Sequence, residues 1–351
     1  MRMQLILVLS VLLVTASAHA QESGDGHAVS RVLVYNDDDA TTVVTSIVDA
    51  EATLPKNISI GAYALLDAVS SASIDVVSAA TGRWTENRVE AGARLAAPVA
   101  GTTVSIGASR SQENDWLSHT VTAGVSREFF ERNTIVTAGY AFTRNKVGRA
   151  MDPNFEESLR AHTGEVSVGQ LLDRNTRAGV AYTMQALSGF QSSPYRYVAA
   201  TDGATVAEIH PDTRMRHALS GFVLRSLTPQ LSTRLSYRLY RDDWGIWSHT
   251  GSLRFSMEAS KHIRLALDAR MYNQSRADFY RRSYSTSFSY MSRDRELASF
   301  WDAGAGGEVV AQLGPVTVDA RVGAIRYRFR NFPSLPKRIA ILAGAGAKVE
   351  W

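Results

Sequence analysis

Alternation between apolar and polar residues, repeated in segment after segment, is the feature that most constrains the fold of this chain. Between Leu231 and Arg241 the odd-numbered residues are mainly apolar, and the even-numbered residues are mainly polar or charged. The same period of two recurs from Val89 to Ala97 and from Lys261 to Gln274. Because successive side chains of a strand point to opposite faces, each segment is predicted to form a strand with one apolar face and one polar face.

The C-terminal segment, Arg338 to Trp351, shows this alternation with an aromatic residue at its end. Ile339, Ile341 and Trp351 fall on one face with other apolar residues, and the opposite face is small or polar except for Leu342. A terminal aromatic residue on the apolar face resembles the closing strand of bacterial outer-membrane barrels, so Trp351 is the candidate assembly signal. An edge strand of a soluble β-protein is the alternative for this segment alone.

Composition narrows the class of protein without deciding it. The chain has 351 residues, no cysteine, 45% hydrophobic residues and a net charge of +4. Without cysteines, stability is expected to come from packing and backbone pairing, not from disulfides. The positive charge is not clustered in a basic run, which argues against a nucleic-acid partner. No phosphate-binding glycine loop and no Cys/His metal spacing is present, so no cofactor is predicted.

The N-terminus predicts export. Arg2, an apolar core from Leu5 to Val14 and the small residues around Ala20 have the form of a secretory signal peptide over residues 1–20. The core is too short for a membrane-spanning helix, which needs roughly 20 apolar residues. We therefore expect a signal peptide at 1–20, a flexible segment at 21–30 and one domain at 31–351.

The spacing of the strand segments predicts an all-β fold, a transmembrane antiparallel β-barrel of about 16 strands (14–18). Short turns alternate with longer connections, as in outer-membrane barrels with short periplasmic turns and longer external loops. A secreted β-sandwich would also have short strands, but its inward faces would meet a dry core rather than Arg, Asp, Thr and Ser. The longer connections are expected at 37–39, 70–83, 112–115, 146–159, 190–213, 242–245, 273–296 and 331–337.

In such a barrel the polar faces line the lumen, and arginines outnumber acids there. The lumen-lining candidates are Arg88, Arg94, Arg234, Arg238, Arg254, Arg264, Arg270 and Arg321. Arginines that line a pore favour anions. In the alternative interpretation they pair with lumen acids such as Glu90, Glu165, Asp268 and Asp319 and stiffen the wall without conducting. The sequence leaves both open.

A second group of candidates falls at the ends of strands and in loops on the side expected to be external. These external-mouth candidates are His210, Asp212, Arg214, Asp242, Asp243, Trp244, Asp278, Tyr280, Asp294 and Glu296. Paired acids with a histidine could activate water by general-base catalysis, which makes a hydrolase a minor hypothesis. No catalytic residue is assigned. Asp37, Asp38 and Asp39 are weak calcium candidates, because an acidic turn without alternating ligands is usually only solvated.

Several sequence blocks resemble one bacterial family, a domain of unknown function regarded as outer-membrane β-barrel-like. The blocks read DDDATTV from Asp37, ASIDVVSAAT at 72–81, PYR from Pro194, HPDTR from His210, YRLYRDDWGI from Tyr237, QSRADFY from Gln274 and RDRELASF from Arg293. They occur in the family's order over most of the chain after the predicted signal peptide. The resemblance implies a barrel but brings no activity, ligand or catalytic residue.

We expect a porin-like protein in the outer membrane of a Gram-negative bacterium, acting as a pore or channel for small solutes, anionic ones included. One alternative is a closed barrel that serves as a scaffold or docking partner for a periplasmic or surface protein. The second alternative is an outer-membrane hydrolase with an acidic site at the external mouth. The expected partners are outer-membrane lipid and the barrel assembly machinery.

Overall fold

The computed structural model describes residues 26–71, 84–150, 152–199, 205–330, 332 and 335–351. The predicted signal peptide and the family block at 72–81 lie outside these residues. Among the described residues, no helix has both the length and the apolar character to span a membrane.

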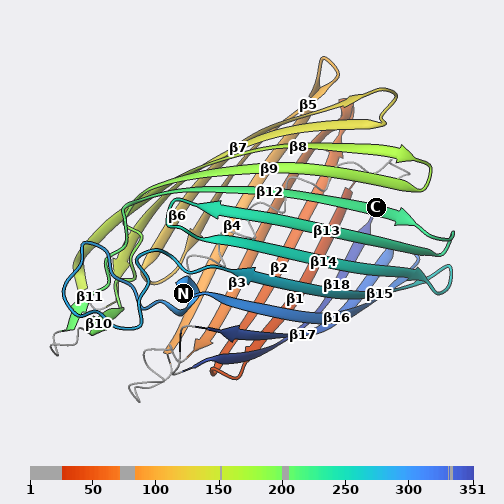
Figure 1. Ribbon diagram of the computed structural model, residues 1–351. Coiled ribbons are helices and arrows are strands. Elements are labelled where there is room, and N and C mark those ends of the chain that lie inside the picture. The colour runs from red at the N-terminus through yellow and green to blue at the C-terminus, as the bar shows by residue number, and fades with distance from the viewer. Residues whose placement is uncertain (1–25, 72–83, 151, 200–204, 331, 333–334) are drawn as a thin grey trace.

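Sixteen antiparallel strands close into one barrel, which confirms the fold predicted from the alternation. The order around the ring is β1-β18-β17-β16-β15-β14-β13-β12-β9-β8-β7-β6-β5-β4-β3-β2 (Figure 1). The strands are β1 (Gly26–Asp37), β2 (Thr41–Leu54), β3 (Ile58–Ser71), β4 (Trp84–Val99), β5 (Thr102–Gln112), β6 (Trp116–Phe129), β7 (Thr134–Arg149), β8 (Asp152–Asp173), β9 (Thr176–Gly189), β12 (Thr213–Ser226), β13 (Leu231–Asp242), β14 (Trp247–Glu258), β15 (Ile263–Gln274), β16 (Phe300–Leu313), β17 (Val316–Phe329) and β18 (Lys337–Glu350).

The barrel closes where the first strand pairs with the last. β1 and β18 are antiparallel with Val32 opposite Ala345, and the backbones of Gly26 and Trp351 exchange two hydrogen bonds of 3.1 Å. The first strand therefore begins at Gly26, and the expected flexible segment 21–30 was placed too far along the chain. Residues 26–30 look polar in sequence, but pairing with β18 on one side and β2 on the other satisfies their backbone groups.

The two faces of the wall follow the predicted alternation. In β18, Ile339 and Ile341 are exposed on the outside, while Arg338 and Ala340 are buried on the inside. Exposed valines, leucines and isoleucines cover the outer face of the other strands in the same way. An apolar exterior around a polar interior is the pattern of a barrel that stands in lipid.

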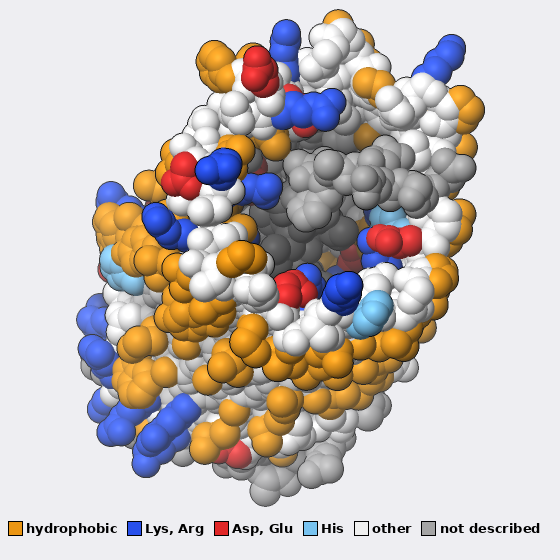
Figure 2. Space-filling model, turned by 90° about the vertical axis from the view of Figure 1, so that its right-hand side faces the viewer, with side chains coloured by type: hydrophobic (Ala, Val, Ile, Leu, Met, Phe, Trp, Pro, Cys, Tyr) orange, Lys and Arg blue, Asp and Glu red, His pale blue; other side chains and the backbone are white. Residues whose placement is uncertain are grey.

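The two ends of the barrel differ, as predicted. One end, the turn end, carries short connections such as Pro55–Asn57 and the Gly314-Pro315 turn. In a view onto this end the molecule is hollowed, and charged side chains of both signs lie around the opening (Figure 2). The other end, the loop end, carries the long connections 190–212 and 275–299.

The connection expected at 146–159 is not a loop, and that prediction was wrong. β7 continues to Arg149 and β8 begins at Asp152, and their pairing continues through Val147 opposite Glu157. The outward residues of the hairpin here, such as Lys146, Glu156 and Ser158, are polar, so no apolar outer face marks the strands, although Val147 and Leu159 are buried on the inward side. Backbone pairing between neighbouring strands does not need lipid-facing side chains.

Candidate functional site: the mouth layer and the lumen

The two long loops pack together at the loop end, and we call the described parts of 190–212 and 275–299 the mouth layer. The first loop contains the short hairpin of β10 (Tyr197–Ala199) and β11 (Thr205–Ala207), at the left of Figure 1. Ile209 and Met291 join the loops through two backbone hydrogen bonds of 3.0 and 2.8 Å. Met291 is 1% exposed, so the junction between the loops is a dry contact.

The mouth layer is tied to the barrel rim at widely separated points. The Tyr195 hydroxyl donates to Asp115 in the turn between β5 and β6. Arg295 donates to Asp39 in the turn between β1 and β2 over 2.5 Å. The two loops also bind each other, so a continuous series of contacts joins the rim at β6 to the rim beside β18 by way of the loops. The mouth layer is therefore anchored at the β5–β6 and β1–β2 turns, on either side of the strands that carry its two loops.

Glu208 is the centre of a buried charge cluster inside this layer. Its carboxylate lies 3.3 Å from Arg196 and 3.0 Å from His210, and it accepts a 2.7 Å hydrogen bond from Ser292. Arg196 also lies 2.9 Å from the carboxylate of Asp294. One guanidinium thus joins acids from both loops, which fixes one loop against the other.

The environment of these acids keeps them ionised. Burial alone would raise the pKa of Glu208, but the hydrogen bond from His210 and the charge of Arg196 hold that pKa below its ordinary value. Burial likewise opposes ionisation of Asp294, and the charge of Arg196 and the backbone N–H of Glu296 hold its pKa well below its usual range. Each carboxylate therefore stabilises the mouth layer in its charged form.

The acidic turn at 37–39 is occupied by protein groups. Asp37 accepts hydrogen bonds from the backbone N–H of Asp39 and of Thr41, at 3.1 and 2.9 Å. Asp38 accepts from Ile339 over 2.7 Å, while Asp39 is bound to Arg295. These three acids, the weak calcium candidates, therefore close a turn and hold the buried Arg295.

Arg214 and Asp242 form a second buried pair, below the mouth layer on the inner wall. Asp242 accepts hydrogen bonds from Arg214, from Tyr240 at 2.7 Å and from the backbone N–H of Trp244 and Ile246. The Arg214 guanidinium also lies 4.0 Å from the centre of the Trp244 ring. Asp242 therefore has its lone pairs occupied by structural bonds.

The external-mouth candidates are brought together only in part. The His210 ring packs against Trp244, at 5.2 Å between centroids, and the backbone N–H of Asp278 donates to Trp244 over 2.9 Å. Glu296 binds Arg338 at 3.3 Å on the adjoining wall. The side chains of Asp212, Asp243 and Asp278 are exposed.

Tyr280 is buried in the apolar core of the second loop, with Trp244, Ile246 and Leu297. This burial, with the nearby charge of Asp294, raises the pKa of Tyr280 to about 12. The phenol therefore stays neutral over the ordinary pH range and acts as a packing residue in this arrangement.

All eight predicted lumen arginines lie on inward-facing positions of their strands, and they divide into two groups. Four bind carboxylates: Arg88 with Asp67 and Glu90, Arg94 with Asp49 and Glu51, Arg254 with Asp268 and Glu308, and Arg270 with Asp302. The other four, Arg234, Arg238, Arg264 and Arg321, form no ion pair with any described residue. Both sequence interpretations thus have support, and a paired and an unpaired arginine can share a strand, as Arg270 and Arg264 do on β15.

Two of the unpaired arginines, Arg234 and Arg238, lie across the ring from a group of lumen acids, whereas Arg264 and Arg321 share their strands with Asp268 and Asp319. Arg177 on β9 and Arg216 on β12 join Arg234 and Arg238 on β13 in a patch without a bound carboxylate among the described residues, which we call the arginine arc. Half-way round the ring, β2 to β4 carry Asp49, Glu51, Asp67 and Glu90 against Arg88 and Arg94. We call this set of six residues the acidic arc.

The two arcs also overlap in height. Glu51 and Arg234 are each the fourth residue from the turn end of their strands, β2 and β13. A net positive wall therefore faces a net negative wall across the lumen, and such an arrangement sets up a field across a water-filled space. Between the arcs, β5 to β7 present Ser, Thr and Gly to the lumen at positions such as Ser109, Thr120 and Gly139.

Sequence reasoning missed the residues that organise the mouth layer. Arg196 and Arg295 lie inside blocks that carried the family resemblance, and Glu208 lies two residues before His210. A buried charge in a loop has no periodic pattern, so only those blocks pointed to them. Arg216 was missed because the alternation in β12 is weak.

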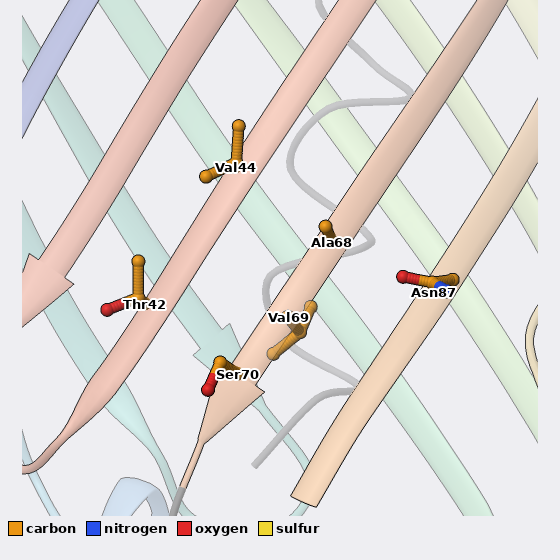
Figure 3. Close-up of a pocket in the computed structure, with 6 residues that line it drawn as sticks. All are labelled: Thr42, Val44, Ala68, Val69, Ser70 and Asn87. Atoms are coloured by element: carbon orange, nitrogen blue, oxygen red, sulfur yellow. The ribbon is translucent and has the colours of Figure 1, made fainter.

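Two other features carry no chemistry of their own. Glu86, Glu113 and Asp115 bring carboxylate oxygens within 4.8 Å of one another at the loop end, but proximity of acids does not define a metal site. A shallow depression of about 210 Å³ lies on the wall at β2, β3 and β4 (Figure 3). Its lining, Thr42, Val44, Ala68, Val69, Ser70 and Asn87, includes no titratable side chain.

Comparison with known proteins places the chain in a family. Two overlapping segments, 79–163 and 149–331, match the family described as Protein of unknown function (DUF3570). The chain belongs to this family. The resemblance predicted from the sequence blocks is thereby confirmed, and no curated protein matches the DUF3570 chain.

Solved structures with a similar fold are outer-membrane proteins. A structure described as a bacterial polysaccharide outer membrane secretin is 9% identical, with a TM-score of 0.55 over 94% of this chain and 100% of the other. The siderophore receptors PirA from Acinetobacter baumannii and PirA from Pseudomonas aeruginosa are 9% and 11% identical, with TM-scores of 0.49 and 0.48 over 88% and 93% of this chain. The chain covers 54% and 62% of those receptors. At 9% identity, the likeness to the secretin structure is one of fold, an outer-membrane type of barrel.

Proposed function

We propose that this DUF3570 protein is an outer-membrane pore for small anionic solutes, with the mouth layer acting as a filter at its external end. The observation that carries the proposal is the arginine arc opposite the acidic arc. An unpaired arginine in a wet lumen attracts anions, and the facing acids orient a solute that also carries positive charge or hydroxyl groups.

Export and assembly belong to the same proposal. Residues 1–20 would direct the chain across the inner membrane, and Trp351 would present the last strand to the barrel assembly machinery. The apolar outer wall supports a final place in lipid, with the short turns on the periplasmic side.

The test is conductance and reversal potential of the folded protein in a planar bilayer across a KCl gradient. We expect channels that prefer chloride over potassium. Replacement of two members of the arginine arc, Arg234→Ser with Arg238→Ser, should reduce that preference several-fold. The matched control replaces two outward arginines near the turn end, Arg127→Ser with Arg225→Ser, and should leave the preference unchanged.

Absence of channels from folded protein would overturn the pore proposal. That outcome would favour the alternative of a closed barrel that docks a periplasmic or surface protein. The mouth layer is the feature that suits the alternative, because its buried charges hold a fixed surface at the loop end.

A further inference from the structure

Four neighbouring strands carry a row of basic side chains on the outside of the barrel, towards the loop end. Arg110 on β5 lies opposite His119 on β6, His119 lies opposite Arg144 on β7, and Arg144 lies opposite Arg160 on β8. All four side chains are exposed, and they share the outward face of their strands with the apolar wall. We call these four residues the basic row.

No carboxylate among the described residues neutralises the positive charge of the basic row. Arg144 and Arg160 are directly opposite each other, and like charges in that position destabilise a sheet. On the outward side of β4 to β9, Glu156 is bound to Lys146 at 2.7 Å and Asp173 lies at the turn end near Arg225, and no described carboxylate forms an ion pair with a member of the row. An anion that is not part of the chain would therefore neutralise the charge of the basic row and stabilise it.

Three tyrosine–histidine pairs on the outer face mark a single level of the barrel just below this row. The hydroxyl-to-Nδ1 distances are 2.7 Å for Tyr140 with His162, 2.6 Å for Tyr182 with His217 and 2.5 Å for Tyr237 with His249. Each tyrosine is the seventh residue of its strand, counted from the turn end of β7, β9 and β13. Tyrosines at a common level on an outer wall form the aromatic girdle of a membrane interface.

The outer face of β7 and β8 changes character in one direction. From Val136 the outward residues of β7 run through Tyr140 and Phe142 to Arg144, and on β8 His162 lies beside Phe142 just below Arg160. Arg144 lies four residues beyond Tyr140, roughly 10 Å higher at about 2.5 Å of axial rise per tilted residue. Apolar, aromatic and then cationic residues follow in the order of acyl chains, interface and charged headgroups.

We propose that the basic row binds the phosphate groups of a phosphorylated glycolipid of the lipid A class in the outer leaflet. Guanidinium groups bind phosphate through paired N–H donors, and several arginines side by side suit a headgroup with more than one phosphate. The acyl chains of the lipid would lie along the valines below the girdle. This site is on the outer wall and does not depend on whether the lumen conducts.

The experiment measures lipid binding to the folded full-length protein in neutral detergent micelles by native mass spectrometry. The probes are bis-phosphorylated lipid A and the same lipid with both phosphates removed. We expect binding of the first lipid and little binding of the second. In the double variant Arg144→Ser with Arg160→Ser, affinity for the phosphorylated lipid should fall about 30-fold. Each basic side chain at a membrane surface contributes roughly a factor of five to affinity, and the two factors multiply.

The matched control is Arg127→Ser with Arg225→Ser, which removes two outward arginines near the turn end and should bind like wild type. A heat-modifiable band shift verifies that each variant is folded. Equal binding of the dephosphorylated lipid to wild type would overturn the proposal without any variant. So would unchanged binding by the Arg144/Arg160 variant, or competition by inorganic phosphate at the same concentration as the lipid.

Discussion

Arginine–carboxylate pairs occur in two regions of this protein and have different environments in each. Where the mouth layer meets the rim, the side chains of Arg295 and Asp39 are 0% and 7% exposed. In the lumen, those of Arg254 and Asp268 are 33% and 38% exposed. The same chemistry thus holds loops together in one region and lines a wet wall in the other.

The difference teaches that burial, more than the number of ion pairs, decides what a pair does here. A buried charge that loses its partner keeps its desolvation cost, which makes removal of one partner strongly destabilising. A half-exposed charge that loses its partner is solvated by water at little cost. Mutations in the mouth layer should therefore change stability, and mutations in the lumen should mainly change the field.

The largest effect is expected from Asp39→Asn, because Arg295 would remain buried with its charge uncompensated. The mouth layer should lose about 3–5 kcal/mol of local stability, while the barrel stays folded. Amide hydrogen exchange of 275–299, compared with that of the strands, measures the change. Replacing both partners, Asp39→Leu with Arg295→Met, should restore protection. Normal protection in Asp39→Asn would show that the pair does not hold the layer.

Acid should loosen the mouth layer before it affects the barrel. The pKa values of Glu208 and Asp294 are lower in the folded protein than in an unfolded, solvated chain. The two carboxylates therefore stabilise the mouth layer fully when the pH is above their unfolded pKa values of about 4. This stabilisation is lost as the pH falls through the folded values. Trypsin cannot report at such pH, so pepsin cleavage within 190–212 is the measurement. Replacing Glu208 by Gln should remove most of this pH dependence.

An intermediate effect is expected from Arg94→Ser in the acidic arc. The Arg94 side chain is 31% exposed and binds Asp49 at 2.6 Å and Glu51 at 2.8 Å. Its loss should cost about 1 kcal/mol of barrel stability and should shift selectivity towards cations, because two acids are left unpaired. Urea unfolding in vesicles and the reversal potential measure the two parts. If Arg94→Ser lowered the free energy of unfolding as much as the loss of the buried Arg295–Asp39 pair does, burial would not distinguish the mouth layer from the lumen.

The smallest effect is expected from Asp268→Asn in the lumen. Arg254 keeps its second partner, Glu308, and both groups of the broken pair are partly in water. The free energy of unfolding should change by less than about 1 kcal/mol. The same urea titration serves as the measurement, with Arg127→Ser as a control for loss of a charge on the outer wall.

Sequence periodicity was sufficient to predict the strands of the barrel wall, because the alternation within each strand shows which of its faces is apolar. The faces of Leu231–Asp242 and of the last strand, Lys337–Glu350, could be assigned from a period of two, without knowledge of their neighbours. The family blocks at His210, Tyr237 and Arg293 pointed to the correct loops. The start of β1 at Gly26 and the long β7–β8 hairpin were missed, since the outward residues there are small or polar and form no apolar row.

By itself, then, the sequence determined a barrel wall with an apolar outer face and a polar inner face, because apolar and polar residues alternate locally along the chain. Only the tertiary structure decided which charges meet. Arg295 finds Asp39 across 256 positions of sequence, and the arginine arc faces the acidic arc only because the ring closes. Contacts between distant segments depend on how the strands and loops are arranged, and no local pattern records that arrangement.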